Sequence, residues 1–339
     1  MSTNLENKNV VLQFFKNLNN ADDAQCKNVL NTYLSEDITL NISHPFTEMR
    51  GVDSYYNNFW KPLTNAFPDF EIQPYICVGG DYENRSYVSS TGNIIGTFTK
   101  NWLDIPATNQ PTWLRFSGHF IIENSIIKKA WFFFDFLDVM RQAGYNLFPN
   151  RGIEIVPPAP MTGDGIVTYF TTPEQGQESL KLTNNMLDGL GSYDGKTLDS
   201  MGQEHFWNEK DMMWYGPSGI GTTRGLKGFQ KNHQVPFITA FPDRGITEKV
   251  DNDYFTQIGD GNYSCDFGFP AMYGTHLADG WLGLKTTKKR ITLRVVDYWR
   301  REDNRLKENW VFIDMPHVLQ QLGIDVFALL KEKINNNKL

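Results

Sequence analysis

The sequence TNAFPDFEI at residues 64–72 has a near copy, ITAFPDRGI, at residues 238–246. The match continues in order and spacing on both sides of the shared Ala-Phe-Pro-Asp. Aligned residues are first 174 positions apart (50 and 224) and later 179 apart (102 and 281), so one small insertion separates two blocks. The aligned pairs are Arg50 with Arg224, Pro62 with Pro236, Trp102 with Trp281, Leu114 with Leu293, Glu123 with Glu302, Trp131 with Trp310, Asp135 with Asp314, and Gln142 with Gln321.

This correspondence predicts a tandem duplication of one unit of about 140 residues, far longer than the ~20 to 50 residues of a solenoid repeat. Each copy should therefore be a domain with its own core. The predicted domains are residues 1–148 and 177–339. Residues 149–176 contain five prolines and no helical period, and we expect an irregular linker there.

The order of elements within one copy predicts an α+β domain. Apolar residues at helical spacing come first, near 10–18, 26–34 and 52–67, and four strand-like segments follow between 70 and 135. A curved antiparallel sheet wrapped round helices would leave a cavity between them. The repeated Ala-Phe-Pro-Asp has a structural interpretation, since Pro stops the helix and Asp can bond nearby backbone amides.

Composition narrows the class of protein. The chain of 339 residues has a net charge of −7 and scattered basic residues, which argues against a nucleic-acid partner. It lacks the roughly 20 consecutive apolar residues of a membrane span, and its first residues do not resemble a signal peptide. Three distant cysteines and six histidines without metal-ligand spacing predict no disulfide framework and no metal. We expect a cytoplasmic protein.

Several motifs of the second half resemble the SnoaL-like polyketide cyclases of the nuclear transport factor 2-like superfamily. They are Gly274-Thr275-His276, Gly280-Trp281-Leu282-Gly283, Leu293-Arg294-Val295-Val296-Asp297-Tyr298, Trp310, Asp314 and Gln321-Leu322-Gly323. The resemblance covers most of both halves and is better in the second. It implies two cone-shaped domains with internal pockets, in which an acidic residue serves as general acid and base without a cofactor. The superfamily also includes isomerases, dehydratases and domains that only bind.

The strand-like segment 291–299 carries the main catalytic candidate. Alternation puts Asp297 on one face with Ile291, Leu293, Val295 and Trp299. If that face lines the pocket, burial disfavours the charged carboxylate and raises its pKa, which suits proton exchange near neutral pH. The alternative is a strand-end Asp in water or beside an Arg.

Other candidates surround Asp297 in the predicted pocket. His276 could relay a proton or polarise a carbonyl, although a strand His is often scaffolding. Asp314 and Trp310 share a face of the next strand, and Asp314 recurs as Asp135, which also suits a helix cap. The predicted pocket further contains Trp299, Tyr215, Trp214 and His233, although single groups such as the last three are more often packing residues than chemical groups.

The two copies differ at the candidate positions. Gly118 stands where the second copy has Asp297, and Phe98 stands where it has His276. We therefore interpret the first copy as degenerate, with a pocket that would contain His44, Asp135 and Trp131. It could stabilise the second copy, form an internal pseudo-dimer in a monomer or homodimer, or bind without reacting.

The leading hypothesis is a cofactor-independent acid/base enzyme acting on a small carbonyl-bearing substrate in the C-terminal pocket. Cyclisation, isomerisation, dehydration and hydrolysis could all use the same groups. The rival hypotheses are a non-catalytic protein that binds a small apolar or aromatic metabolite, and a purely structural pseudo-dimer.

Overall fold

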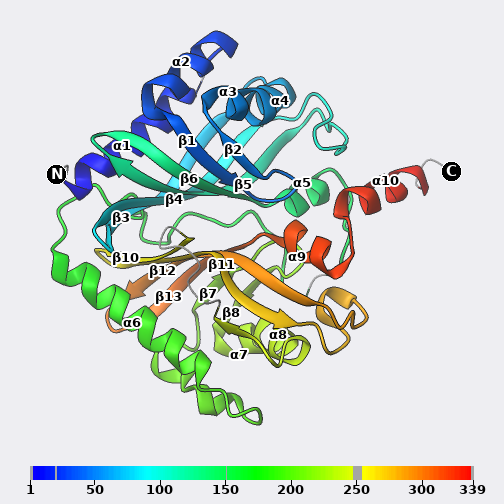
Figure 1. Ribbon diagram of the computed structural model, residues 1–339. Helices are drawn as coiled ribbons and strands as arrows, with labels where there is room; N and C mark the ends of the chain where they lie inside the picture. Colours follow the sequence, from blue (N-terminus) through cyan, green and yellow to red (C-terminus); the bar gives the residue numbers. More distant parts are fainter. Residues whose placement is uncertain (1–2, 20, 150, 247–253, 337–339) are drawn as a thin grey trace. The chain divides into compact units, whose positions relative to one another are not determined.

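The computed structural model describes residues 3–19, 21–149, 151–246 and 254–336 (Figure 1). The chain forms two compact units. Unit 1 comprises residues 1–147, 163–168 and 324–339, and unit 2 comprises residues 148–162 and 169–323.

Unit 1 begins and ends with helices, and its strands lie between them in the sequence. Its elements are α1 (Asn4–Leu18), α2 (Asp23–Tyr33), β1 (Leu34–Ile42), β2 (Glu48–Arg50), α3 (Val52–Tyr55), η1 (Tyr56–Trp60), α4 (Lys61–Ala66), β3 (Glu71–Tyr82), β4 (Arg85–Thr97), β5 (Pro111–Glu123), β6 (Ile126–Phe134), α5 (Phe136–Gln142) and α10 (Val326–Asn336).

Unit 2 repeats this plan with a longer first helix. Its elements are α6 (Pro173–Gly191), η2 (Leu198–Met201), η3 (Gln203–His205), β7 (Met213–Tyr215), β8 (Thr222–Arg224), α7 (Gly225–Phe229), η4 (Gln230–Gln234), α8 (Val235–Ala240), β9 (Gly245–Ile246), β10 (Phe255–Asp260), β11 (Tyr263–Thr275), η6 (Trp281–Gly283), β12 (Arg290–Glu302), β13 (Arg305–Ile313) and α9 (Met315–Leu322).

The two sheets have the same topology, which confirms the duplication and the α+β fold class. The first is ordered β2-β1-β6-β5-β4-β3, and the second β8-β7-β13-β12-β11-β10, with β9 paired to β11. In each sheet one parallel pair, β1 with β6 or β7 with β13, joins otherwise antiparallel strands. Both sheets are curved and neither closes into a barrel (Figure 1).

The repeated Ala-Phe-Pro-Asp makes the same contact in both units. Asp69 accepts hydrogen bonds from the backbone N and the hydroxyl of Thr97 at 2.7 and 2.6 Å. Asp243 accepts the corresponding pair from Thr275 at the same two distances. The threonine side-chain bond is the main reason that the pKa of each carboxyl lies below its usual range. Each Asp therefore ties the end of a helix to the end of a long strand.

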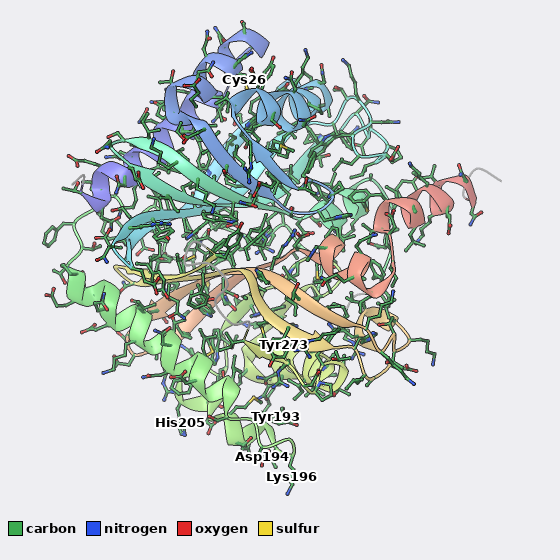
Figure 2. The ribbon with its side chains drawn as sticks, in the orientation of Figure 1. Cys26, Tyr193, Asp194, Lys196, His205 and Tyr273 are labelled. Carbon is green, nitrogen blue, oxygen red and sulfur yellow. The ribbon has the colours of Figure 1, made fainter. Side chains whose placement is uncertain are left out.

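Unit 2 adds a cation to this contact. Arg290 places its Nη1 3.6 Å from Oδ2 of Asp243, and its guanidinium lies 4.2 Å from the ring centre of Tyr273. Tyr273 is labelled in Figure 2. The pair is exposed, so solvent screens most of its attraction and the threonine bonds dominate.

We expect Asp69→Ala and Asp243→Ala each to lower the free energy of unfolding by about 1 kcal/mol at pH 7, since both carboxylates are solvent-screened acceptors. Because the folded pKa values are depressed, this contribution is present above the unfolded pKa of about 4 and is lost as the pH falls through the folded value. Urea unfolding at pH 7 and pH 3 measures it, with exposed Asp37→Ala as control. An effect in only one unit would contradict a shared role.

A second repeated contact closes each unit. Gln142 exchanges two hydrogen bonds with the backbone of Trp113, at 2.9 and 2.7 Å. Gln321 exchanges two with the backbone of Thr292, both at 2.9 Å. Helices α5 and α9 are thereby fixed to the starts of β5 and β12, which accounts for the repeat of Gln in the sequence.

The segments between and after the two copies are distributed over both units. Helix α6 begins at Pro173, inside the predicted linker, because Thr172 and Gln175 form a reciprocal capping box. Residues 163–168 extend the sheet of unit 1, where Cys77 bonds Gly165 and Val167 through its backbone. The last helix, α10, packs with unit 1 rather than with the second copy.

Candidate active site

Helices cover one side of the second sheet, which we call its inner face. Helix α6 lies against it at Thr183, whose hydroxyl is 2.6 Å from that of Ser264 on β11. Helix η4 lies against it at His233, whose ring stacks on Trp214 of β7 with centroids 4.2 Å apart. Ser264 and Trp214 therefore point to the inner face.

Two aspartates stand side by side on this face. Trp299 of β12 is the register partner of Ser264, and Asp297 precedes it by two residues, so both point inward. Asp266 of β11 is the direct register partner of Asp297. Side chains paired in this way have Cβ atoms about 5 Å apart. Buried Leu293 and Val295 continue the same row along β12.

Amide side chains flank the carboxylate pair. Gln257 donates to Oδ2 of Asp266 at 2.6 Å, and Asn309 donates to Oδ1 of Asp297 at 3.1 Å. Both aspartates are half-buried. Burial raises the pKa of Asp266 to about 6, partly offset by the bond from Gln257. A carboxyl group with that pKa exchanges protons close to neutral pH.

The indole of Trp299 adds an unused donor beside the pair. Its side chain is 3% exposed, and its Nε1 finds no hydrogen-bond partner among the described residues. On α6, Oδ1 of Asn184 is likewise buried without a partner in the described part of the chain. Unpaired buried polar groups are costly and mark places where a ligand or water completes the bonding.

Asp266 was missed by the sequence reasoning. Its segment, YSCDFGF at residues 263–269, alternates large apolar residues with Ser, Asp and Gly. That alternation places Asp266 on the face opposite Tyr263 and Phe267. The pattern was available, but its pairing with Asp297 depends on strand register, which the sequence does not specify.

Two predicted pocket residues, Trp310 and Tyr215, lie on the opposite face of the sheet. Trp310 is the register partner of Tyr298 on β12 and of Tyr215 on β7. Tyr298 directly follows Asp297, so these three side chains point away from the face that carries Asp297. The indole of Trp310 donates to the carbonyl of Pro158 at 2.9 Å. These two predictions are wrong because adjacent strands place Trp310 across from Tyr298 rather than from Asp297.

On that outer face the buried pair Arg300 and Glu308 holds part of residues 149–172, the segment that connects the two copies. Nε of Arg300 donates to Oε2 of Glu308 at 2.5 Å, and the Tyr215 hydroxyl donates to Oε1 at 3.3 Å. The backbone N of Met161 also donates to this carboxylate, at 3.3 Å. Tyr215 and Trp310 thus fasten residues 158–161 to the sheet.

His276 is remote from Asp297, so the predicted cooperation between them is wrong. The backbone N of His276 donates to the carbonyl of Lys289. From there to Asp297 are eight residues of extended chain, roughly 26 Å. His276 is fully buried, stacked on Phe241 with centroids 5.4 Å apart. Burial is also the main reason that its pKa is lowered.

Asp314 and Asp135 are helix caps rather than pocket acids. Asp314 accepts from the backbone N of His317 and forms an ion pair with Arg294 at 3.0 Å. Asp135 accepts from the backbone N of Asp138. The contacts of both aspartates are therefore those of a helix cap, the alternative that the repeat of Asp in both copies also suited.

The remaining first-copy candidates are not gathered into one site. Trp131 of β6 pairs with His119, one residue out of step with Gly118, so it lies on the outer face of the first sheet. His44 follows β1, and its ring lies 6.2 Å from that of Phe327 on α10.

In unit 1, aromatic side chains fill the place that corresponds to the aspartate pair of unit 2. Gly118 pairs with Ser90 and with Phe132. A Cβ at Gly118 would lie 2.5 Å from the ring of Phe120, and Phe120 packs on Phe132 and Phe15 at 5.4 and 5.9 Å. An acidic side chain has no room there, so the inner face of unit 1 is a packed core at this position.

No other chemical centre emerges from the described residues. They hold no cluster of three His, Cys, Asp or Glu side chains placed to ligate a metal. Across the same ranges, every helix is too short or too polar to traverse a bilayer.

Comparison with known proteins assigns the first half of the chain to a family. Residues 9–143 match the family model of the SnoaL-like polyketide cyclases. The first unit is therefore a SnoaL-like domain, and the second unit repeats the topology of its sheet. The expected resemblance is confirmed. The match lies in the first half, however, although the motifs were judged better in the second.

Solved structures of single-domain proteins align with about two fifths of the chain. A protein assigned to the SnoaL-like polyketide cyclases from Jannaschia sp. CCS1 is 18% identical, with 41% of this chain and 92% of that chain covered and a TM-score of 0.35. One assigned as a polyketide cyclase from Acidithiobacillus ferrooxidans is 19% identical (42% and 98% covered, TM-score 0.35). A nuclear transport factor 2-like protein from Burkholderia xenovorans LB400 is 17% identical (43% and 97% covered, TM-score 0.32). No curated protein gives a significant match.

Proposed function

We propose that unit 2 catalyses proton transfer at a carbon next to a carbonyl group of a small substrate, without a cofactor. The observation that carries this proposal is the direct pairing of Asp266 and Asp297 on the inner face, with the pKa of Asp266 raised to about 6. Two neighbouring carboxyl groups resist ionising together, so between about pH 4 and pH 6 the pair tends to keep one proton.

The proposed step begins with ionised Asp297 as the base. It removes a proton from the carbon next to the substrate carbonyl, and the C–H electron pair becomes the C=C bond of an enolate. The indole N–H of Trp299 faces inward two residues along β12 and has no hydrogen-bond partner among the residues that the structure describes. It donates to the developing oxygen anion. Protonated Asp266 is the adjacent proton reservoir.

The outcome then depends on where the enolate carbon reacts. Attack on a second carbonyl of the same molecule forms a C–C bond, and the alkoxide takes the proton held by Asp266, which is an aldol cyclisation. Reprotonation at another carbon gives an isomer. The SnoaL-like family favours the first outcome, and both need the same groups.

Deuterium exchange into a ketone tests the proposal without knowledge of the natural substrate. The full chain is incubated with β-tetralone in D2O, and loss of the proton signals next to the carbonyl is followed by NMR. Because the singly protonated pair is the active form, the catalysed rate should fall as the pH rises above about 6. A catalysed rate that is flat from about pH 4 to pH 8, or no catalysed exchange, would contradict the proposal, and the latter would favour a binding protein.

A further inference from the structure

A buried asparagine lies beside the aspartate pair on the inner face of unit 2. Asn309 of β13 is the register partner of Trp299 on β12 and of Trp214 on β7, so it points inward between two indole side chains. Its exposed fraction is 3%. An amide buried among apolar rings is costly unless it is hydrogen-bonded, so each of its hydrogens needs an acceptor.

Both amide hydrogens of Asn309 are used. Its Nδ2 donates to Oδ1 of Asp297 at 3.1 Å and to the backbone carbonyl of Tyr298 at 3.1 Å. A carbonyl oxygen can only accept, so the second bond fixes which end of the amide faces β12. Asn309 therefore presents a donor to Asp297, and it cannot turn its own oxygen toward that carboxyl group without losing the bond to Tyr298.

The amide on the other side of the pair is less restricted. Gln257 of β10 is the register partner of Asp266 and donates from Nε2 to Oδ2 of Asp266 at 2.6 Å. In the described part of the chain this amide makes no second bond, so it can turn and accept the O–H of a protonated carboxyl group. Gln257 thus tolerates either state of Asp266, whereas the fixed donor of Asn309 favours ionised Asp297.

The duplicated unit shows that the fold does not require this asparagine. At the shift of 179, Ala130 is the counterpart of Asn309, and Gly118 is the counterpart of Asp297. The amide and the carboxylate are therefore present together in one copy and absent together from the other, although the two sheets have the same topology. A role in folding alone does not account for Asn309.

We propose that Asn309 is a positioning residue of the aspartate pair, whose amide keeps Asp297 ionised as the base and thereby leaves the shared proton on Asp266. A hydrogen bond donated to a carboxylate favours its charged form, and charge on one carboxylate disfavours charge on its neighbour. Burial acts in the same direction, because it raises the pKa of Asp266 to about 6. The inference rests on the proposed function, for which it assigns the two roles.

Charged side chains near the pair on other elements have partners of their own. Lys307 of β13 pairs with Asp211 at 2.6 Å, and Arg301 of β12 donates to a serine hydroxyl of α6 at 3.0 Å. His233 of η4 is neutral near pH 6, because burial lowers its pKa to about 3. The pH dependence expected here is therefore that of the aspartate pair. The buried residues of α6 do not titrate; they are Gly176, Ser179, Thr183 and Met186.

Carboxyl titrations of an alanine variant test this role without a substrate. Asn309→Ala installs the residue of the first unit. With ¹³C-labelled aspartate in the full chain, the NMR titration midpoint of Asp297 should rise by about one pH unit, the usual worth of one hydrogen bond to a charged group. Asn304→Ala makes the same change in the exposed turn after β12 and should leave that midpoint where it is. An unmoved or lowered midpoint in Asn309→Ala would overturn the proposal.

The pH profile of deuterium exchange separates this inference from the proposed function. The acid side of the profile depends on ionisation of Asp297, so in Asn309→Ala it should move up by about one pH unit, with about a tenfold loss of rate on that side. A structural role would lower the rate equally at every pH. If the parent chain exchanges β-tetralone protons and the acid side stays in place in the variant, the inference fails and the proposed function stands. If the parent chain does not exchange them, the proposed function fails, and the carboxyl titration decides the inference.

A measurement on the unaltered chain covers the case in which thermal melting shows that Asn309→Ala does not fold. The side-chain N–H signals of Asn309 are followed by ¹⁵N NMR as the pH is lowered. They should move chiefly at the midpoint of Asp297, because protonation of that carboxylate weakens the bond at 3.1 Å. Signals that move chiefly at the midpoint of Asp266, or that do not move, would overturn the proposal.

Discussion

Asp297→Asn should slow the catalysed exchange of β-tetralone protons by about 10²- to 10⁴-fold, the usual contribution of a general base. Asparagine keeps the shape of the side chain and still offers an oxygen to the amide of Asn309, which now donates at 3.1 Å. The fold should therefore be unchanged. What is lost is the ability of the side chain to accept a proton from carbon.

Asp303→Asn is the matched control for this variant. Asp303 lies in the exposed turn between β12 and β13, at φ +51°, which asparagine tolerates well. The same chemical change there should leave the exchange rate as it is. Retention of most of the rate in Asp297→Asn would contradict the assignment of the base.

Asp266→Asn should stabilise unit 2 at pH 8 by about 2 kcal/mol and leave its stability at pH 4 unchanged. The pKa of Asp266 is about 6 in the folded protein and about 4 when unfolded. A raised carboxyl pKa penalises the folded state once the group ionises. The penalty is absent below about pH 4, grows between pH 4 and pH 6, and is complete above pH 6. The difference between the folded and unfolded pKa values of Asp266 corresponds to about 3 kcal/mol for a fully buried group. Partial exposure of the carboxyl group reduces this energy.

Hydrogen exchange of the β11 and β12 amides measures this effect in unit 2 alone, at pH 8 and at pH 4. Gln257 can still donate to the side-chain oxygen of asparagine, so the bond at 2.6 Å does not confound the comparison. Destabilisation at pH 8, or an equal effect at both pH values, would contradict a raised pKa. Stabilisation with loss of activity is the usual sign of a group kept for chemistry.

Sequence pattern predicted the fold because each copy repeats its landmarks at fixed spacing. Ala-Phe-Pro-Asp ends a helix and bonds a strand end in both units, as Asp69 and Asp243 show. Alternation along 291–299 placed Asp297 and Trp299 on one face. These inferences need only the local periods of helix and strand, which are read along one segment at a time.

The rest of the site depends on how strands pair, which local patterns do not encode. Alternation in β13 grouped Trp310 with Asp314, but only register shows that Trp310 faces away from Asp297. The same holds for Asp266, which becomes a partner of Asp297 through pairing alone. His276 follows the last residue of β11, at the far end of that strand from Asp266.

The contrast between the copies explains why only one keeps the carboxylate pair. In unit 1, Phe120 and Phe132 occupy the space that a side chain at Gly118 would need. In unit 2 the counterpart of Phe120 is Trp299, whose buried N–H lacks a partner among the described residues. At this position the first copy has a packed aromatic core, and the second has the indole of Trp299.

The titration of the inner-face aspartates tests the account most directly. With ¹³C-labelled aspartate, the carboxyl signals of Asp266 and Asp297 can be followed by NMR and assigned by their loss in the two asparagine variants. A group that changes protonation near pH 6, and whose signal is the one lost in Asp266→Asn, is the predicted result. If both carboxyl groups titrate below about pH 4, as free aspartates do, unit 2 does not hold the proposed proton-sharing pair.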